Sequence, residues 1–274
     1  MKLFKNKNSA SLLSLPYMTW AIIFIVVPLA MVVYYGLTDS AGHFTLSNIT
    51  TIAKPGYLKA LIRSVRLAVI STIVCFVLAY PLGMILSSMK LTRNTYIVTL
   101  FILPMWMNFL LRTLTWMTLL EGKGVINTIL EALHLPTINI INTPSAIVLG
   151  MVYNFLPFMI LPIYNSLSKI DENVINAARD LGADSLQTFL KITLPLSVPG
   201  ILSGITMVFI PALTTFAIST MLGGSKILLI GNIIEQEFTQ LYDWHLGSGL
   251  SIVLMIFIFI NMIIESLSDS KGGK

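Results

Sequence analysis

Charged residues are scarce in this sequence of 274 residues. Asp, Glu, Lys and Arg together make up 11% of it, against 55% hydrophobic residues. A soluble domain has about 25% charged residues, so this chain has too little polar surface to cover a core in water. The shortage excludes an ordinary soluble enzyme and favours a chain whose solvent is lipid. The mean hydropathy of +0.85 agrees with this interpretation.

Cysteine and histidine are also rare, with one cysteine and three histidines. Cys75 has no partner for an internal disulfide, and its apolar neighbours indicate a small core residue. His43, His134 and His245 are isolated and lack the paired spacing of a metal site. The sequence contains no phosphate-binding loop, no zinc-protease motif and no nucleophile elbow. We therefore expect no catalytic centre, and no metal or cofactor bound by this chain.

Long apolar runs are what the sequence does contain. Six segments approach the roughly 20 apolar residues that cross a membrane as a helix, and none shows the alternation of a barrel strand. The predicted fold is therefore an all-α membrane protein with six transmembrane helices, spanning residues 16–267 between an N-terminal tail (1–15) and a C-terminal tail (268–274). The predicted spans are Pro16–Leu37, Leu67–Leu86, Thr95–Leu111 (continuing past Arg112), Ser145–Ser168, Ser197–Leu222 and Leu246–Ile264.

Basic residues set the expected orientation. With the N-terminus inside, ten of the 17 Lys and Arg residues fall in cytoplasmic segments and seven in outer segments, in the direction of the positive-inside rule. The uncharged run that follows Lys2, Lys5 and Lys7 is too long for the apolar core of a signal peptide, so we expect an uncleaved first span. Both termini are then cytoplasmic.

The one long cytoplasmic loop, residues 169–195, is predicted to form two short helices. Asp171 opens the first, where negative charge is favourable, and Gly182 fits the left-handed position that ends it. Asp184 with Gln187 forms a capping pattern that begins the second. Such a loop either transmits force from another protein to the spans on its two sides or merely connects them. The candidate coupling residues are Asn176, Ala177, Ala178, Arg179, Asp180, Leu181 and Gly182.

The spacing in this loop resembles the EAA loop of ABC importer permeases. Ala177-Ala178, Gly182 and the later Ile192-Thr-Leu-Pro195 match every fixed position of that pattern except the first, where Asn176 replaces Glu. Residues 103–116, 222–232 and 243–247 resemble signatures of polyamine permeases. The resemblance implies a type I ABC importer permease (MetI-like) fold, in a subunit that forms half of the pathway for spermidine or putrescine.

The same resemblance implies a set of partners. These are a second homologous permease, a dimer of ATPase subunits that uses ATP and Mg, and an extracytoplasmic polyamine-binding protein, in the lipid of a bacterial plasma (inner) membrane; nucleic acid is not a partner. The alternatives are a permease for another small cation or ferric iron, and a secondary transporter. The spans lack ionisable residues near their centres, which disfavours the secondary transporter.

A polyamine is a flexible polycation, so its path should offer aromatic faces and oxygen atoms. The aromatic candidates are alternatively packing residues, and Arg112 is either an anchor at the lipid interface or a fixed charge at the outer gate. The pathway or gate candidates are Trp106, Asn108, Arg112, Tyr153, Asn154 and Phe155. The candidates for an acidic outer vestibule or a docking site for the binding protein, or else ordinary loop charges, are Glu121, Glu235, Glu237 and Asp243.

Overall fold

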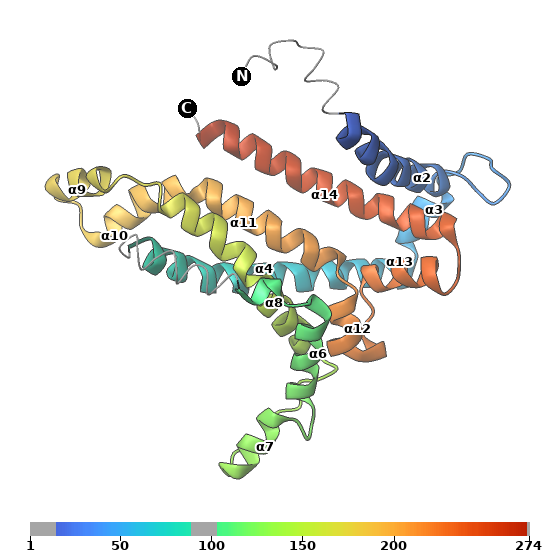
Figure 1. The fold of residues 1–274 in the computed structure, drawn as a ribbon, viewed down its shortest axis with the longest axis horizontal. Coiled ribbons are helices and arrows are strands. Elements are labelled where there is room, and N and C mark those ends of the chain that lie inside the picture. The colour runs from blue at the N-terminus through green and yellow to red at the C-terminus, as the bar shows by residue number, and fades with distance from the viewer. Residues whose placement is uncertain (1–14, 89–102, 273–274) are drawn as a thin grey trace. The chain divides into compact units, whose positions relative to one another are not determined.

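The computed structural model describes residues 15–88 and 103–272, and helices dominate them (Figure 1). Within these ranges the only β-structure is an isolated bridge between Thr38 and Phe44. The α-helices are α2 (Val27–Gly36), α3 (Ser47–Thr50), α4 (Pro55–Ser88), α6 (Phe109–Leu120), α7 (Val125–Ala132), α8 (Pro144–Leu167), α9 (Glu172–Asp180), α10 (Ser185–Thr188), α11 (Leu194–Thr214), α12 (Ala217–Gly223), α13 (Ile230–Thr239) and α14 (Trp244–Gly272).

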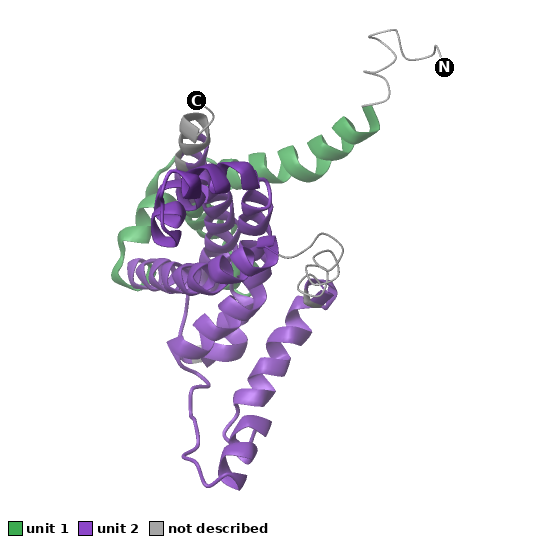
Figure 2. Ribbon diagram, turned by 90° about the vertical axis from the view of Figure 1, so that its left-hand side faces the viewer, with its two compact units in different colours: residues 1–57, 234–256 green, residues 58–233, 257–274 purple. Residues whose placement is uncertain are grey.

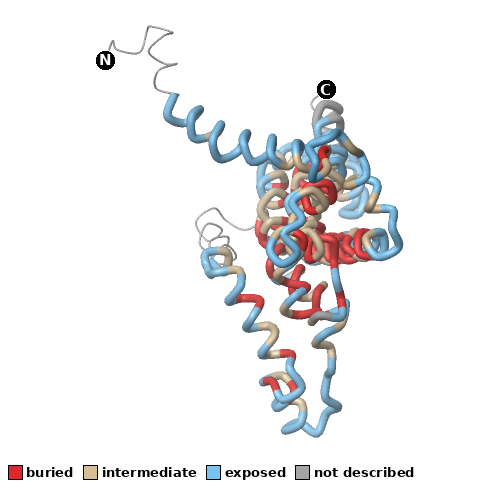
Figure 3. Tube along the Cα trace, turned by 90° about the vertical axis from the view of Figure 1, so that its right-hand side faces the viewer, coloured by how far each residue is buried: buried red, intermediate tan, exposed pale blue. Residues whose placement is uncertain are grey.

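Five helical segments in the described residues are long and apolar enough to cross a membrane. They match five of the six predicted spans, and the two largest differences are at the starts of two segments, Pro55 instead of Leu67 and Ser185 instead of Ser197. The first segment has a mean hydropathy of 2.1 and no buried residue in its most apolar window, as the exposed N-terminal helix of Figure 3 shows. An apolar helix without a protein neighbour needs lipid as its solvent. The segments are Leu15–Gly36, Pro55–Ser88, Pro144–Leu167, Ser185–Thr214 and Trp244–Ile263.

The predicted third span is wrong as a single uninterrupted helix. Residues 95–102 lie outside the described residues, and after them the chain forms a short 3₁₀ turn, Leu103–Trp106, before α6 begins. The Asn108 side chain accepts hydrogen bonds from the N–H groups of Leu110 (2.8 Å) and Leu111 (3.3 Å). An N-cap of this kind satisfies donors that a helix start leaves free. The helix therefore restarts at Phe109 and runs past Arg112 to Leu120.

The predicted fifth span also breaks before its expected end. Helix α11 stops at Thr214, Thr215 is extended, and α12 begins at Ala217. Asn232, only 4% exposed, repairs the break. Its amide nitrogen donates to the Phe216 carbonyl (3.1 Å) and to the Thr220 hydroxyl (2.8 Å), and its amide oxygen accepts from Ser219 (2.6 Å) and from the N–H of Leu229 (3.0 Å). One side chain therefore compensates for the interrupted helix.

The chain divides into two compact units, of which residues 58–233 with 257–274 form the larger (Figure 2). Its core lies along α8, whose neighbours are α6, α11 and α12, with α4 close at Gly83, where a Cβ atom would lie 2.9 Å from Ile163 Cγ2. Helices α8 and α11 approach closely at Gly200, where a Cβ atom would lie 2.6 Å from the carbonyl oxygen of Pro162. The Tyr80 hydroxyl lies 2.9 Å from Ser197 Oγ and links α4 to α11.

The smaller unit comprises residues 1–57 and 234–256. Here α2 ends against the beginning of α14, and two side chains serve the carbonyl groups that the helix end leaves free. Asn48 donates to the Thr38 carbonyl (2.9 Å), and His245 Nδ1 lies 2.7 Å from the same oxygen and 3.1 Å from the Tyr35 carbonyl. Both partners of His245 are acceptors, so its Nδ1 carries the proton. This histidine therefore closes a helix end and is not a free surface residue.

Replacement of Asn232 by alanine should destabilise the protein. The change removes four hydrogen bonds at a buried break, and each buried polar group left unpaired costs about 1–3 kcal/mol. We expect a clear fall in the thermal unfolding midpoint of the purified protein, measured in detergent by intrinsic fluorescence. Asn165→Ala, on an exposed position of α8, is the control and should change the midpoint little. Equal midpoints for the two variants would contradict the role given to Asn232.

Candidate functional site

Two short helices form the loop between α8 and α11, as the sequence predicts. Asp171 caps α9, because its Oδ1 accepts from the N–H of Asn173 (2.9 Å). At the other end, the N–H of Gly182 donates to the Arg179 carbonyl (2.9 Å) and that of Ala183 to the Ala178 carbonyl (3.0 Å). This pair of bonds is a Schellman motif, and Gly182 has the positive φ of 86° that the motif requires. The glycine position is therefore confirmed.

The second helix of the loop begins as predicted and continues into α11. Asp184 Oδ1 accepts from the N–H of Gln187 (2.7 Å) at the start of α10. A π-helical turn, Phe189–Thr193, then joins α10 to α11, so the stretch Ser185–Thr214 is continuously helical. The second half of the loop and α11 therefore belong to one continuous helix that is long enough to cross a membrane.

The candidate coupling residues, 176–182, lie together on α9 and its C-terminal end. No residue of α9 is buried, and Leu181 is 91% exposed. Leu186 on α10 is 65% exposed. Apolar side chains held in the open beside charged ones are typical of a surface that another protein covers.

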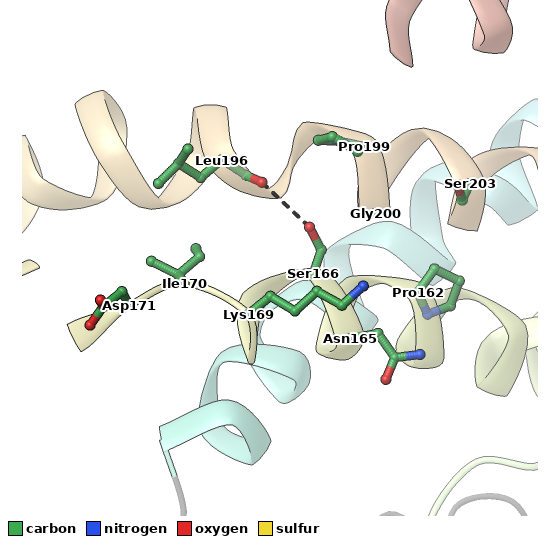
Figure 4. A pocket seen from close by; sticks show the side chains of 10 residues that line it. All are labelled: Pro162, Asn165, Ser166, Lys169, Ile170, Asp171, Leu196, Pro199, Gly200 and Ser203. Atoms are coloured by element: carbon green, nitrogen blue, oxygen red, sulfur yellow. Dashed lines mark hydrogen bonds between the residues drawn. The ribbon is translucent and has the colours of Figure 1, made fainter. Parts of the chain in front are cut away.

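Directly beneath this loop, α8 and α11 meet around a cavity of about 530 Å³ (Figure 4). The Ser166 hydroxyl donates to the Leu196 carbonyl (3.4 Å) across the junction, and Gly200 allows the close approach to Pro162. Lys169 and Asp171 lie at the loop end of the cavity. The two helices that flank the loop are thus in direct contact next to it.

The pathway candidates do not form one cluster. Trp106 is 79% exposed, and the Asn108 side chain is engaged as the cap of α6. Tyr153 packs edge-on against Trp116 with ring centroids 5.3 Å apart, and Phe155, 7% exposed, stacks on Phe109 at 6.4 Å. These two aromatic pairs join α6 to α8. For Tyr153 and Phe155 the geometry therefore agrees with helix packing, the alternative that the sequence leaves open.

Arg112 on α6 and Asn154 on α8 are buried polar residues. Arg112 is 6% exposed, so its side chain is buried instead of extending to the lipid interface, and its Nε and Nη1 atoms have no hydrogen-bond partner among the described residues. Asn154 donates to the Gly150 carbonyl (2.9 Å) and to the Thr113 hydroxyl (3.3 Å), while its Oδ1 is also unpaired there. A guanidinium group is always charged, and its burial without a counter-charge is energetically costly. Arg112 is therefore a fixed positive charge inside the described part of the protein.

Two of the four candidate vestibule carboxylates lie close together. Glu237 is 5% exposed; burial raises the pKa of its carboxyl group above the usual range, the negative charge of Asp243 raises it further, and a hydrogen bond from Tyr57 partly offsets this rise. Glu235 Oε1 instead accepts from the Thr239 hydroxyl (2.9 Å), and Glu121 belongs to the larger unit. Of the four candidates, the structure therefore brings together only Glu237 and Asp243.

Asp243 also lines an open cavity of about 500 Å³ within the smaller unit. Its Oδ1 caps α14 by accepting from the N–H of Leu246 (2.9 Å), which leaves Oδ2 for a ligand. Tyr35 and Trp244 lie beside it with ring centroids 6.3 Å apart, and Tyr242 and His245 complete this wall. Among the described residues that line the cavity there is no lysine or arginine. A carboxylate flanked by aromatic rings is suited to an organic cation.

Tyr35 and Trp244 are not among the site residues predicted from the sequence. Trp244 follows the chosen Asp243 directly, so an aromatic residue beside a carboxylate was a usable signal. Tyr35 lies near the other end of the chain, at the end of α2, and no local pattern links it to Asp243. Only the packing of α2 against α14 brings them together.

Comparison with known proteins shows the family of this chain. The family described as "Binding-protein-dependent transport system inner membrane component" matches residues 69–269. The spermidine/putrescine transport system permease protein PotB of Escherichia coli (strain K12) is 38% identical over 253 residues, which cover 89% of this chain and 92% of the relative. PotB of Haemophilus influenzae is 34% identical over 99% of both chains.

A solved structure gives the same fold at low sequence identity. A chain of a bacterial ABC transporter involved in the import of the acidic polysaccharide alginate superposes with a TM-score of 0.77 at 17% identity, over 99% of this chain and 98% of that one. The described helices therefore have the MetI-like arrangement of type I ABC importer permeases. This chain belongs to the binding-protein-dependent transport system inner membrane component family: it is a non-enzymatic, multi-pass permease subunit of an ABC importer, which works with ATPase and binding-protein partners.

Proposed function

We propose that this permease forms one half of a translocation pathway for spermidine or putrescine. The two PotB relatives carry those substrates in their names and match nearly the whole chain. The observation in this chain that supports a polyamine is the cavity in which Asp243 lies beside the rings of Tyr35 and Trp244. The described residues contain no group of three metal-binding side chains, which favours an organic cation over the alternative of ferric iron.

The other half of the pathway comes from a second, homologous permease. Two ATPase subunits bind ATP and Mg on the cytoplasmic side, and a polyamine-binding protein delivers substrate on the opposite side. In this arrangement both termini of the chain are cytoplasmic, as is the loop that contains α9. The exposed Leu181 and the small Ala177 and Ala178 then form the face that enters a groove of the ATPase.

Coupling follows from the junction of α8 and α11. When ATP binding closes the ATPases, force on α9 reaches both helices, because they touch at Gly200 and Pro162 next to the loop. Because α8 and α11 are in contact at Gly200 and Pro162, they move together, and the permease changes from inward-facing to outward-facing. ATP hydrolysis reverses the change. The Schellman motif keeps α9 at a fixed angle to α10, so that force is transmitted and not absorbed by a flexible turn.

Residues of opposite charge have different roles in this proposal: Asp243 attracts the polyamine, and Arg112 repels it. The cavity that contains Asp243 lies on the outer side of the membrane in this proposal, and we call it the outer cavity. It holds an ammonium group through Asp243 and the faces of Tyr35 and Trp244. Trp106 is exposed enough to contact a cation. The buried positive charge of Arg112 repels a polyamine, so this residue acts as a gate that keeps cations out of the α6–α8 contact.

The direct test is the ATPase activity of the assembled transporter in proteoliposomes with its binding protein. We expect stimulation by spermidine or putrescine, together with uptake of the radiolabelled polyamine, and no stimulation by ferric ion. A polyamine is the wrong substrate if the ATPase is active but responds to neither polyamine. If no ATPase co-purifies with the chain, the proposed assembly itself is wrong.

Replacement of Gly182 by valine should impair coupling. A left-handed conformation costs a residue with a Cβ atom about 1–2 kcal/mol, and a β-branched residue more. We expect polyamine uptake at matched expression to fall about tenfold in Gly182→Val, with an intermediate effect of Gly182→Asn, since asparagine tolerates this conformation.

Gly122→Val is the matched control for this change. A Cβ atom at Gly122 meets nothing within 4 Å, as at Gly182, but only Gly182 has the left-handed backbone. The control should transport normally. Uptake by Gly182→Val equal to that of the control would show that the ending of α9 does not matter for coupling.

Replacement of Asp243 by asparagine tests the outer cavity. Asparagine still caps α14, so the change removes the charge and preserves the fold. An exposed ion pair contributes up to about 1 kcal/mol, so we expect about fivefold weaker binding of spermidine to the purified transporter in the absence of binding protein. Glu131→Gln, which removes an exposed charge from α7, should leave binding unchanged. If Asp243 docks the binding protein instead, spermidine binding will be normal and more binding protein will be needed for half-maximal ATPase activity.

A further inference from the structure

A third cavity, of about 550 Å³, lies between α4 and α8 in the larger unit, away from the coupling loop. Arg63, Arg66, Leu67 and Ile70 of α4 form one side. The other side is the first turn of α8, with Pro144, Ser145 and Val148. None of the functions assigned above uses these residues.

The end of this cavity formed by Arg63 and Arg66 carries positive charge, which no acidic side chain of the described residues neutralises. The only ion pair among those residues joins His43 and Asp39, and no carboxylate lines the cavity. The guanidinium of Arg63 donates to the Leu228 carbonyl at 3.5 Å, a weak bond that leaves most of its donors free. Arg66 is exposed. Two planar, always charged guanidinium groups at one cavity are suited to a phosphate, which they bind through paired hydrogen bonds.

The first turn of α8 adds to this positive potential. Thr143 caps the helix through a bond from the N–H of Ala146 to its hydroxyl (3.4 Å), and the following residues, Pro144 and Ser145, line the cavity. An α-helix of 24 residues has a positive dipole end here, and Ser145 provides a hydroxyl group as well. The arginines and the helix end therefore favour the same kind of ligand, an anion.

The part of the cavity away from the two arginines is apolar. Leu67, Ile70 and Val148 continue from the charged end along α4 and α8, both of which are long and apolar enough to cross a membrane. A free phosphate ion would gain nothing from these three side chains. A ligand with an anionic head and a hydrocarbon tail would use both parts of the cavity.

The charge of the cavity also separates it from the proposed transport path. A polyamine is a cation and is repelled by Arg63 and Arg66, whereas the cavity that contains Asp243 has the opposite charge. We infer that Arg63, Arg66 and the first turn of α8 bind the phosphate-containing headgroup of an anionic phospholipid, whose acyl chain lies along Leu67, Ile70 and Val148. The lipid is a bound component of the permease and not a substrate.

The experiment uses the assembled transporter purified in mild detergent and delipidated. Phosphatidylglycerol, phosphatidylcholine with the same acyl chains, and inorganic phosphate are titrated separately while the thermal unfolding midpoint is recorded. We expect a saturable rise of the midpoint with phosphatidylglycerol and much smaller effects of the other two. A basic side chain beside an anionic headgroup contributes a factor of about five in affinity, so Arg63→Gln with Arg66→Gln should weaken the apparent affinity roughly twentyfold or more.

Two further variants make the outcome specific. Lys59→Gln removes an exposed charge of the same helix outside the cavity and should bind lipid normally. Arg63→Lys with Arg66→Lys keeps the charge and should retain more affinity than the glutamine pair, which separates lost binding from lost folding. The inference is overturned if phosphatidylcholine acts as well as phosphatidylglycerol, if inorganic phosphate alone gives the full effect, or if the glutamine pair binds lipid like Lys59→Gln.

Discussion

Satisfaction of backbone hydrogen bonds in an apolar solvent is the constraint on which the structure of this permease depends. Lipid offers no donors or acceptors, so the chain must satisfy its own N–H and C=O groups, and helices do so within one segment. Where a helix is interrupted, a side chain has to supply the missing partner. Asn108 does this at the start of α6, and Asn232 does it between α11 and α12. At the start of α6 the amide oxygen of Asn108 accepts two hydrogen bonds, whereas the amide group of Asn232 both donates and accepts.

This constraint also explains which parts of the fold can be predicted from the sequence. Apolar length alone locates five spans to within a few residues at most boundaries, because lipid requires helix wherever such a run occurs. The ends of α9 are predictable too, since capping by Asp171 and the left-handed turn at Gly182 depend on neighbours in the sequence. The break after Thr214 is not predictable in this way, because the residue that stabilises it, Asn232, follows a loop.

The candidate site divides along the same line. The coupling residues 176–182 are contiguous, so the sequence places them together without any knowledge of packing. The pathway candidates are distributed over the 3₁₀ turn, α6 and α8, and helix packing decides that Tyr153 and Phe155 face other aromatic rings. The cavity that contains Asp243 also needs Tyr35, and these two residues lie before α14 and on α2. When a site is assembled from residues that are distant in the sequence, neither segment alone contains the pattern that would identify it.

Charge separates the ligands of this subunit more clearly than shape does. In the described residues the one ion pair joins His43 and Asp39, so neither Asp243 nor the arginines Arg63 and Arg66 form a salt bridge there. The carboxylate of Asp243 is in an aromatic cavity of the smaller unit, and the paired arginines are in an apolar cavity of the larger one. An ammonium compound and an anionic lipid that reach the same subunit are therefore directed to different cavities, because each is repelled by the charges that attract the other. In a transporter for cations, a bound anionic lipid can satisfy basic side chains without placing a competing negative charge in the transport path.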